Sequence, residues 1–582
     1  MLPKRFPFSS PRGASWRRRF GVGLFSALLA LGGSAAAVAI VGCGGEGDED
    51  RLGSMQDAVQ LVFTYGSEKE KWLEAVTEEF NRRSPTLADG RPIFVEAIPM
   101  GSGQSIDEVI TENRQAHLVS PASAAFIELG NAESRAQTGD DLIGRTQNLV
   151  LSPVVIAMWQ PMAETLGWGE RSLGWSDILE LAQDPDGWAS LGHPEWGTFK
   201  LGHTHPDFSN SGLISLFAEV YAATGKTAGL TREDVDQPAT ADFLRGIESS
   251  IVHYGSSTGF FGRKMFANGP SYLSAAVLYE NMIIESYRSQ QDLPFPVVAI
   301  YPKEGTFWSD HPVGVVNRPW VQEEHREAAQ IYIDWLLEPE RQLRALDFGF
   351  RPANVEVPLG EPVTRRYGVN PEEPQTTLEV PTPEVMQAIR ELWQRNKKRS
   401  EVTLVLDTSG SMREEERMAN AKAGAQQLLD MLSDEDYFSL LTFADQSVWV
   451  AESVRLGSVR EDVHQRIEGV FANGGTRLYD SVIEAYRAQQ LQAQRGSAGE
   501  RIQAIVVLTD GEDTRSEQQQ ADVLSMVDAG SEGVGVRIFT IGYSPDVNAD
   551  ALENIADASR AKFYQGDPRT IRNVFREIST FF

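Results

Sequence analysis

The chain has 582 residues, of which 53 are basic and 82 are acidic, and its formal net charge is −29. This length predicts two to four domains, and the acidic balance argues against a nucleic-acid-binding protein, because phosphate contacts need clustered Lys and Arg. A single cysteine excludes an intrachain disulfide framework, a Cys-based zinc site and an iron–sulfur cluster.

Residues 1–42 are typical of a secretory signal peptide. They contain six basic and no acidic residues, and the stretch from Phe20 to Gly42 is uncharged and rich in small and apolar residues. An uncleaved N-terminal anchor helix is the alternative. Both interpretations place the rest of the chain outside the cytoplasm, and the run Arg17–Arg19 leaves general secretion and twin-arginine export open.

The only cysteine, Cys43, directly follows this segment. The sequence Ile40-Val41-Gly42-Cys43 resembles the lipobox of bacterial lipoproteins, in which the cysteine is lipidated and becomes the first mature residue. The resemblance implies a protein that is held at the cell membrane by a lipid anchor. Residues 43–57 are then expected to form a short, flexible and charged tether.

Residues 58–352 alternate strand-like and helix-like segments, which predicts an α/β domain. Several predicted strands end in small polar residues that lead into a helix, and a helix N-terminus suits a polar or negative ligand group. The candidate solute-binding residues at these positions are Ser67, Ser120, Ser123, Ser209, Asn210, Ser211 and Tyr279. Plain helix capping is the alternative role for any one of them.

Four features together resemble a bacterial extracellular solute-binding protein of the type 2 periplasmic-binding fold, which includes molybdate- and iron-binding members. They are the opening strand–Ser–helix, the SNSG sequence at 209–212, VLYEN at 277–281 and FGFRP at 348–352. The resemblance implies two α/β lobes that close on a solute, the second at about 150–295. We expect a small polar or anionic solute, and no adjacent tyrosine pair supports iron.

The sequence His203-Thr-His205-Pro-Asp207 contains three residues that could bind zinc. It lies in a predicted loop with no further obvious ligand, so we expect a loop at the edge of the cleft. Residues 353–400 are rich in Pro and Glu and predict a linker with one helix at about 384–398, with Thr382 as the N-cap.

Residues 401–582 predict a second α/β domain with a Rossmann-like, doubly wound parallel sheet. Short apolar and β-branched runs at 402–406, 437–443, 504–509 and 536–542 are typical of buried parallel strands. Amphipathic helical segments lie between them, as expected for a sheet that is covered on both faces.

A set of hard oxygen ligands follows two of these strands and one loop. Asp407, Ser409 and Ser411 form a DxSxS sequence, and Thr476 and Asp510 come later in the chain. Hydroxyl and carboxylate oxygens suit Mg²⁺, Mn²⁺ or Ca²⁺ better than zinc. The set resembles the metal-ion-dependent adhesion site of von Willebrand factor A (VWA) domains. The resemblance implies that the ion is coordinated by these five residues and by an acidic group from a protein partner.

Together these features predict a surface-anchored, non-enzymatic lipoprotein that binds a small solute and a protein partner. One alternative is the substrate-binding component of an ABC-type transporter, which would deliver solute to a membrane permease. Another is an assembly or chaperone-like factor for a membrane complex, which rests on analogy of fold alone. A phosphatase-like enzyme is disfavoured because no lysine lies near Asp407 to hold a phosphate.

Overall fold

The computed structural model describes residues 58–289, 292–495, 501–530, 535–545 and 547–582. Residues 54–582 form one compact unit. The predicted signal peptide, Cys43 and the whole predicted tether lie outside the described residues. Within the described ranges, no helix is both long and apolar enough to span a membrane.

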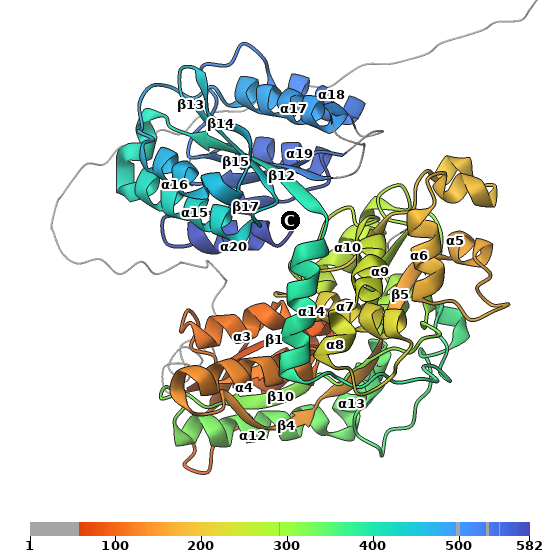
Figure 1. Ribbon diagram of the computed structural model, residues 1–582. Helices are drawn as coiled ribbons and strands as arrows, with labels where there is room; N and C mark the ends of the chain where they lie inside the picture. The colour runs from red at the N-terminus through yellow and green to blue at the C-terminus, as the bar shows by residue number, and fades with distance from the viewer. Residues whose placement is uncertain (1–57, 290–291, 496–500, 531–534, 546) are drawn as a thin grey trace, which may run out of the picture. The chain divides into compact units, whose positions relative to one another are not determined.

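The first lobe of the N-terminal region is built on a five-stranded sheet of order β2-β1-β3-β10-β4. The strands are β1 (Val59–Gly66), β2 (Ile93–Met100), β3 (Leu118–Ser120), β4 (Ile143–Asn148) and β10 (Pro312–Val316). The helices of this lobe are α2 (Glu70–Arg83), α3 (Ser102–Ile110), α4 (Ala124–Thr138), α12 (Glu323–Leu337) and α13 (Pro339–Asp347). Phe63, Trp72 and Tyr332 are fully buried or nearly so in its core. This lobe is coloured red to orange, with green α12 and α13, in Figure 1.

The second lobe is built on a sheet of order β11-β5-β7-β6, in which β8 and β9 also pair with β5. The strands are β5 (Val150–Trp159), β6 (Leu201–Gly202), β7 (Ala275–Tyr279), β8 (Val297–Ile300), β9 (Trp308–Ser309) and β11 (Arg351–Pro352). Its helices are α5 (Gln160–Thr165), α6 (Trp175–Gln183), α7 (Asn210–Thr224), α8 (Arg232–Val235), α9 (Pro238–Glu248), α10 (Thr258–Asn268) and α11 (Glu280–Arg288).

The chain passes between the two sheets at three points. Strand β4 ends at Asn148 and β5 begins at Val150, and β9 ends two residues before His311, which precedes β10. The third crossing leads from α13 to β11, which pairs with the start of β5. Short crossings of this kind suit lobes that move about a hinge. The predicted two-lobed α/β architecture is confirmed, whereas the exact domain boundaries stay predictions.

Helix α14 (Pro383–Asn396) follows the second lobe and lies close to the predicted 384–398. Thr382 is at its N-cap position but makes no capping bond through its side chain. The apolar face, with Ile389 and Trp393 buried, packs on α7, α8 and α9. The helix is thus a packed part of the fold and not a free linker.

The C-terminal region is a six-stranded sheet of order β14-β13-β12-β15-β16-β17. Its strands are β12 (Arg399–Asp407), β13 (Tyr437–Phe443), β14 (Ser447–Arg455), β15 (Arg501–Thr509), β16 (Arg537–Gly542) and β17 (Phe563–Gln565). Its helices are α15 (Arg417–Met431), α16 (Arg460–Glu468), α17 (Leu478–Arg495), α18 (Gln520–Gly530), α19 (Ala549–Ala558) and α20 (Ile571–Ser579). All pairs are parallel except β13 with β14, so the predicted doubly wound sheet is confirmed.

Helices cover both faces of this sheet, as Figure 1 shows. Val405 and Val507, which pair across β12 and β15, pack in a cluster with residues of α17, α18 and α19. Leu404 and Val506 also pair, and they belong to a different cluster that includes residues of α15 and α20. Side chains alternate in this way because successive residues of a strand point to opposite faces. Strands buried on both faces therefore read as continuous apolar runs.

Candidate functional site

The five predicted metal ligands lie at one edge of the C-terminal sheet. Asp407 is the last residue of β12, and Asp510 directly follows β15. These two strands are parallel neighbours, with Leu406 opposite Leu508, so their carboxyl ends meet. Open α/β sheets bind ligands at this edge.

The structure brings four of the five side chains into direct or nearly direct contact. The Ser411 hydroxyl donates to Asp510 Oδ1 at 2.7 Å. The Ser409 hydroxyl lies 3.0 Å from that of Ser411 and 3.4 Å from Asp510 Oδ1. Asp407 is held from both sides, since its Oδ1 accepts from Ser409 N at 2.7 Å and its Oδ2 from Thr509 Oγ1 at 2.6 Å.

The loop that carries Thr476 is fastened to the DxSxS turn through the backbone. Asn473 N donates to Thr408 O at 2.6 Å, and Gly410 N donates to Gly474 O at 3.0 Å. Gly474 has a φ of +90°, which favours glycine at this point of the turn. A Cβ on Gly511 would lie 3.9 Å from Thr476 Oγ1. The Thr476 hydroxyl therefore lies beside the Asp510–Gly511 turn.

Two acidic side chains are buried at this edge of the sheet, where charged groups are rare. Asp407 and Asp510 are almost completely buried, and burial is the main cause that raises the pKa of Asp407 to about 6. Two buried carboxylates and three hydroxyls form a donor set that fits a hard divalent cation. The set is therefore compatible with the ion that the sequence predicts.

Arg417, the first residue of α15, is a member of this site that the sequence analysis missed. Its Nη1 atom donates to Asp510 Oδ2 at 3.1 Å, and only 10% of its side chain is exposed. It neutralises one of the two carboxylates. No motif signals it, because it lies six residues beyond Ser411 at the start of a helix.

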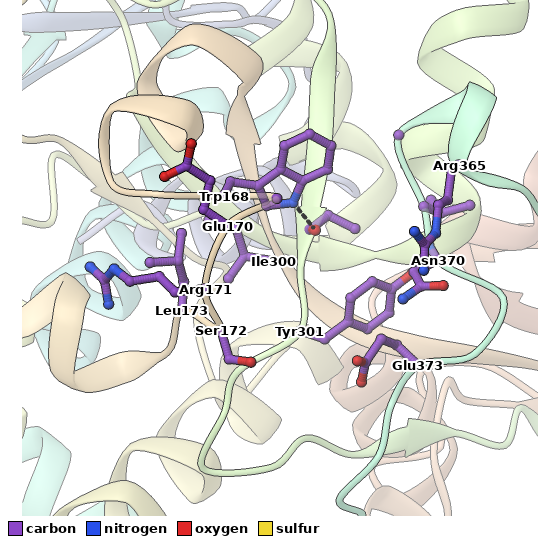
Figure 2. A pocket seen from close by; sticks show the side chains of 14 residues that line it. Trp168, Glu170, Arg171, Ser172, Leu173, Ile300, Tyr301, Arg365, Asn370 and Glu373 are labelled. Atoms are coloured by element: carbon purple, nitrogen blue, oxygen red, sulfur yellow. Dashed lines mark hydrogen bonds between the residues drawn. The ribbon is translucent and has the colours of Figure 1, made fainter.

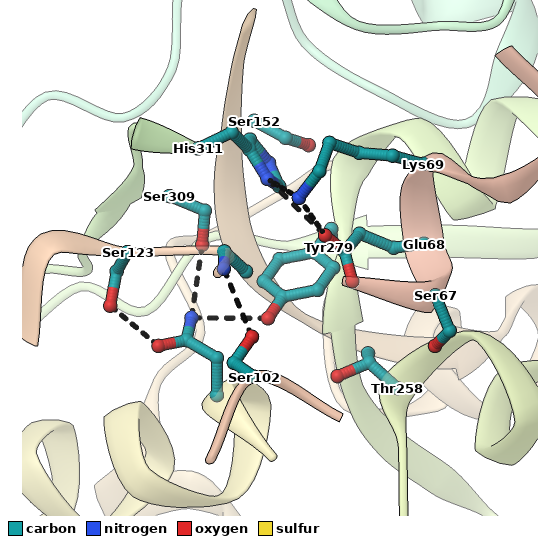
Figure 3. Close-up of polar contacts among 12 residues, drawn as sticks. Ser67, Glu68, Lys69, Ser102, Ser123, Ser152, Thr258, Tyr279, Ser309 and His311 are labelled. Atoms are coloured by element: carbon teal, nitrogen blue, oxygen red, sulfur yellow. Dashed lines mark hydrogen bonds and ion pairs between the residues drawn. The ribbon is translucent and has the colours of Figure 1, made fainter. Parts of the chain in front are cut away.

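The predicted solute-binding residues gather where the two N-terminal lobes face each other, and Figure 3 labels three of them, Ser67, Ser123 and Tyr279. Ser123, at the start of α4 in the first lobe, donates to Asn210 Oδ1 of the second lobe at 2.5 Å. Asn210 Nδ2 in turn lies 3.1 Å from Tyr279 OH. Ser67 Oγ of the first lobe accepts from Gly259 N of the second at 3.0 Å. The lobes are thus in direct polar contact.

The remaining predicted serines lie in the same region. Ser209 Oγ is 3.1 Å from Thr258 Oγ1, which donates to Ser211 Oγ at 2.9 Å. The buried Ser120 hydroxyl has no hydrogen-bond partner in the structure. Ser123 and Ser209 occupy the N-cap positions of α4 and α7, yet neither side chain makes a capping bond. Capping does not explain these two residues.

Three charged or titratable residues of this region were not predicted: Glu68, Lys69 and His311. Lys69 Nζ lies 2.7 Å from Glu68 Oε1 and 3.1 Å from His311 Nδ1, and all three side chains are buried. Burial favours the neutral carboxylic acid, but Lys69 and His311 outweigh it and lower the pKa of Glu68 to about 2. Burial and Lys69 lower the pKa of His311 to about 4. Burial lowers the pKa of Lys69, although Glu68, its ion-pair partner at 2.7 Å, favours the charged form.

The VLYEN and FGFRP sequences meet in a buried ion pair. Arg351 donates through Nε and Nη2 to the two oxygens of Glu280, at 2.8 and 2.7 Å. A two-point pair of this kind fixes geometry as well as charge. These motif residues therefore join β11 to α11 and play a structural role.

The three candidate ligands of the HTHPD sequence have different contacts in the structure. His203 Nε2 lies 3.0 Å from Glu248 Oε1, whereas His205 Nδ1 is 4.0 Å from Asp207 Oδ2. Asp207 is paired with Arg390 of α14 at 2.6 Å. His203 and Asp207 therefore have partners from outside this sequence.

A further cavity of about 430 Å³ lies between the second lobe and the 365–373 segment. Trp168, Tyr301 and Arg365 are among its lining residues (Figure 2), and Trp168 Nε1 donates to Ala299 O at 3.1 Å. None of the predicted site residues lines it. It is distinct from the contact region between the lobes.

Comparison with known families matches both regions. The family model for bacterial extracellular solute-binding proteins matches residues 95–370, and that for von Willebrand factor type A domains matches residues 401–577. The chain joins a solute-binding module to a VWA domain. Both families consist in general of non-enzymatic binding proteins, and the family of the solute-binding module implies a location outside the cytoplasm.

Curated relatives share part of the chain. An uncharacterized protein of Mycobacterium tuberculosis is 25% identical over 235 residues, which is 39% of this chain and 32% of that protein. An uncharacterized protein of Escherichia coli is 27% identical over 165 residues, 28% of each chain. Calcium-activated chloride channel regulator 1 of Bos taurus is 27% identical over 36% of this chain and 21% of its own. The chain thus spans a third or less of the length of these relatives.

Solved structures similar to each module also exist. A periplasmic thiamin binding protein is 15% identical, with 59% of this chain and 97% of that chain covered and a TM-score of 0.42. A von Willebrand factor type A protein from Catenulispora acidiphila is 22% identical. The match covers 32% of this chain and 42% of that chain, with a TM-score of 0.28.

Proposed function

We propose that the protein is a membrane-anchored lipoprotein that binds a small polar solute between its lobes and a protein partner through a cation on its VWA domain. The observation that carries the docking role is the convergence of Asp407, Ser409, Ser411 and Asp510 at one sheet edge. The lipid anchor at Cys43 rests on the sequence alone.

The VWA residues would hold Mg²⁺ or a similar hard cation. Ser409, Ser411 and Thr476 would supply neutral hydroxyl ligands, and Asp407 and Asp510 would act directly or through water. Because most of these ligands are uncharged, a bound divalent cation would keep enough positive charge to attract a carboxylate of the partner. No catalytic role is needed for either module.

Calorimetric titration of MgCl₂ and MnCl₂ into residues 54–582, which form one compact unit, tests this site. Ser411→Ala removes one hydroxyl ligand and should weaken cation binding about tenfold or more. A tenfold loss of affinity corresponds to roughly 1.4 kcal/mol of binding free energy. Ser447→Ala is a control in the same domain, because the Ser447 hydroxyl bonds that of Ser481, at 2.9 Å, and none of the predicted metal ligands. Equal affinity of wild type and Ser411→Ala would refute the assignment.

The solute-binding role is favoured by the polar groups that line the contact between the lobes. Serine hydroxyls, Asn210 and the internally paired Glu68 and Lys69 suit an uncharged or zwitterionic polar solute better than a strongly charged one. Transport remains the second candidate function, because delivery to a permease uses the same cleft. Reconstitution with a candidate permease distinguishes the two roles: stimulated uptake supports transport, and its absence leaves binding alone.

A further inference from the structure

A cluster of three buried residues lies inside the second lobe, apart from the residues assigned to solute binding. His203 follows β6, Glu219 is in the middle of α7 and Glu248 is the last residue of α9. All three side chains are fully buried. One potential ligand atom of each lies within 4.8 Å of those of the other two.

Each residue of the cluster is oriented by a second hydrogen bond. His203 Nδ1 lies 2.8 Å from Thr204 O, which can only accept, so Nδ1 carries the proton. Tyr254 OH donates to Glu248 Oε2 at 2.6 Å, and Ser215 Oγ donates to Glu219 Oε1 at 2.8 Å. A ligating histidine is held in this manner in metal sites, where its other ring nitrogen donates to a carbonyl or carboxylate.

One carboxyl oxygen of the cluster has no partner. His203 Nε2 faces Glu248 Oε1 at 3.0 Å, and although burial favours the neutral imidazole, this carboxylate raises the pKa of His203. Burial raises the pKa of Glu219 to about 8, and its Oε2 atom has no hydrogen-bond partner in the structure. A buried carboxyl oxygen without a partner is costly.

We propose that His203, Glu219 and Glu248 bind a structural divalent cation, with Zn²⁺ as the best match. One imidazole and two carboxylates suit zinc, at ligand distances of about 2.0–2.2 Å. Tetrahedral ligands at that distance lie roughly 3.4 Å apart, so a small inward shift of the three residues would close the site. The cation would also cancel the charge of both carboxylates.

The close packing of the lobe supports a fixed site at this point. A Cβ on Gly212 of α7 would lie 1.9 Å from Thr204 O, so only glycine lets the helix approach the His203–Thr204 segment. Thr204 Oγ1 accepts from Gly212 N at 2.8 Å and lies 2.8 Å from Ser211 Oγ. An ion at this point would tie β6, α7 and α9 together behind the hydroxyls of the cleft.

The test measures zinc in residues 54–582 after unfolding with chelator, refolding with or without ZnCl₂, and dialysis. The expected result is one zinc per chain by mass spectrometry of metals and a melting temperature several degrees above that of the zinc-free sample. Wild type that retains no zinc and shows no thermal shift would overturn the proposal. It would identify the cluster as a proton-sharing network.

Variants locate the ion. Glu219→Gln keeps the side-chain shape and removes the charge, and His203→Gln removes the nitrogen ligand; both should lose the zinc. His193→Gln is the matched control, because His193 and Glu195 form a partly exposed pair at 3.0 Å in the same lobe. Ser411→Ala should also keep its zinc, so that failure of the VWA site is distinguished from failure of this one. Zinc that persists in both Glu219→Gln and His203→Gln would contradict the proposal even if wild type binds it.

Discussion

Replacing Arg417 with glutamine should strengthen cation binding by the VWA domain. The guanidinium is paired with Asp510 at 3.1 Å, so a cation that binds the other side of this carboxylate would lie roughly 6 Å from the positive charge. Repulsion between a double and a single charge at that distance is about 1.4 kcal/mol at a dielectric constant of 80 and about 5.5 kcal/mol at 20. Salt screening and the freedom of the guanidinium to turn towards Glu415, 3.4 Å away, favour the lower figure. We therefore expect roughly tenfold tighter binding.

Calorimetric titration of Mg²⁺ at low and moderate salt measures this change. Arg413→Gln is the control, because Arg413 lies in the same turn but bonds Ala472 O and Asn473 Oδ1 instead of Asp510. Its removal should have a smaller effect. Unchanged or weaker binding in Arg417→Gln would show that Arg417 orients Asp510 for the ion and does not compete with the ion, which would refute this reasoning.

Three further predictions concern the solute-binding module. Asn210→Ala removes the bond to Ser123 across the lobes and should favour an open form by about 0.5–1.5 kcal/mol, seen as a larger radius of gyration in solution scattering; an unchanged radius would exclude this latch. Arg351→Met leaves Glu280 buried and unpaired and should lower the free energy of unfolding by about 3–5 kcal/mol in denaturant titration, whereas Arg365→Met removes only an exposed pair and serves as control. Burial lowers the pKa of His205 to about 3, so the unfolded chain binds the proton first: stability is complete above about pH 6.5 and falls as pH decreases towards 3, by up to about 1.4 kcal/mol per pH unit. His205→Phe should flatten this slope in thermal melts, and an identical slope would contradict the assignment.

Local patterns predict the elements that are buried on both faces. The runs at 402–406 and 437–443 lie within β12 and β13, where nearly every residue is buried. Strand β14 escaped prediction because it is an antiparallel edge strand with only one fully buried residue, Ala451. Its apolar run, Val448–Ala451, has only four residues and is followed by Glu452.

Tertiary contacts help to determine where helix α3 begins. Helix α3 begins at Ser102 and ends at Ile110, although Gly101 and Gly103 flank its first residue. A Cβ on Gly103 would lie 2.0 Å from Asp207 O, so the glycine permits a close approach to the second lobe. Propensity alone cannot reveal a contact with a residue a hundred positions away.

Site residues that belong to a short sequence motif were predicted, whereas those brought together by the fold were not. The convergence of Asp407, Ser409, Ser411 and Asp510 was predictable, because a short motif and two neighbouring strand ends place them. Glu68 and Lys69 are adjacent in sequence, but only the fold brings His311 to them, just as it brings together His203, Glu219 and Glu248. Arg417 lies close in sequence to the motif, but its role depends on where α15 begins.

The net charge of −29 opposes the binding of an acidic partner to this protein. At long range the protein repels such a partner, and this repulsion is screened within about 8–10 Å at physiological salt. At contact, the two buried carboxylates of the VWA site would add to the repulsion, and Arg417 offsets only one of them. A divalent cation reverses the local sign and gives the partner's carboxylate a direct ligand position. Recognition of an acidic partner by this chain would therefore depend on the proposed ion, because the surrounding charge opposes it.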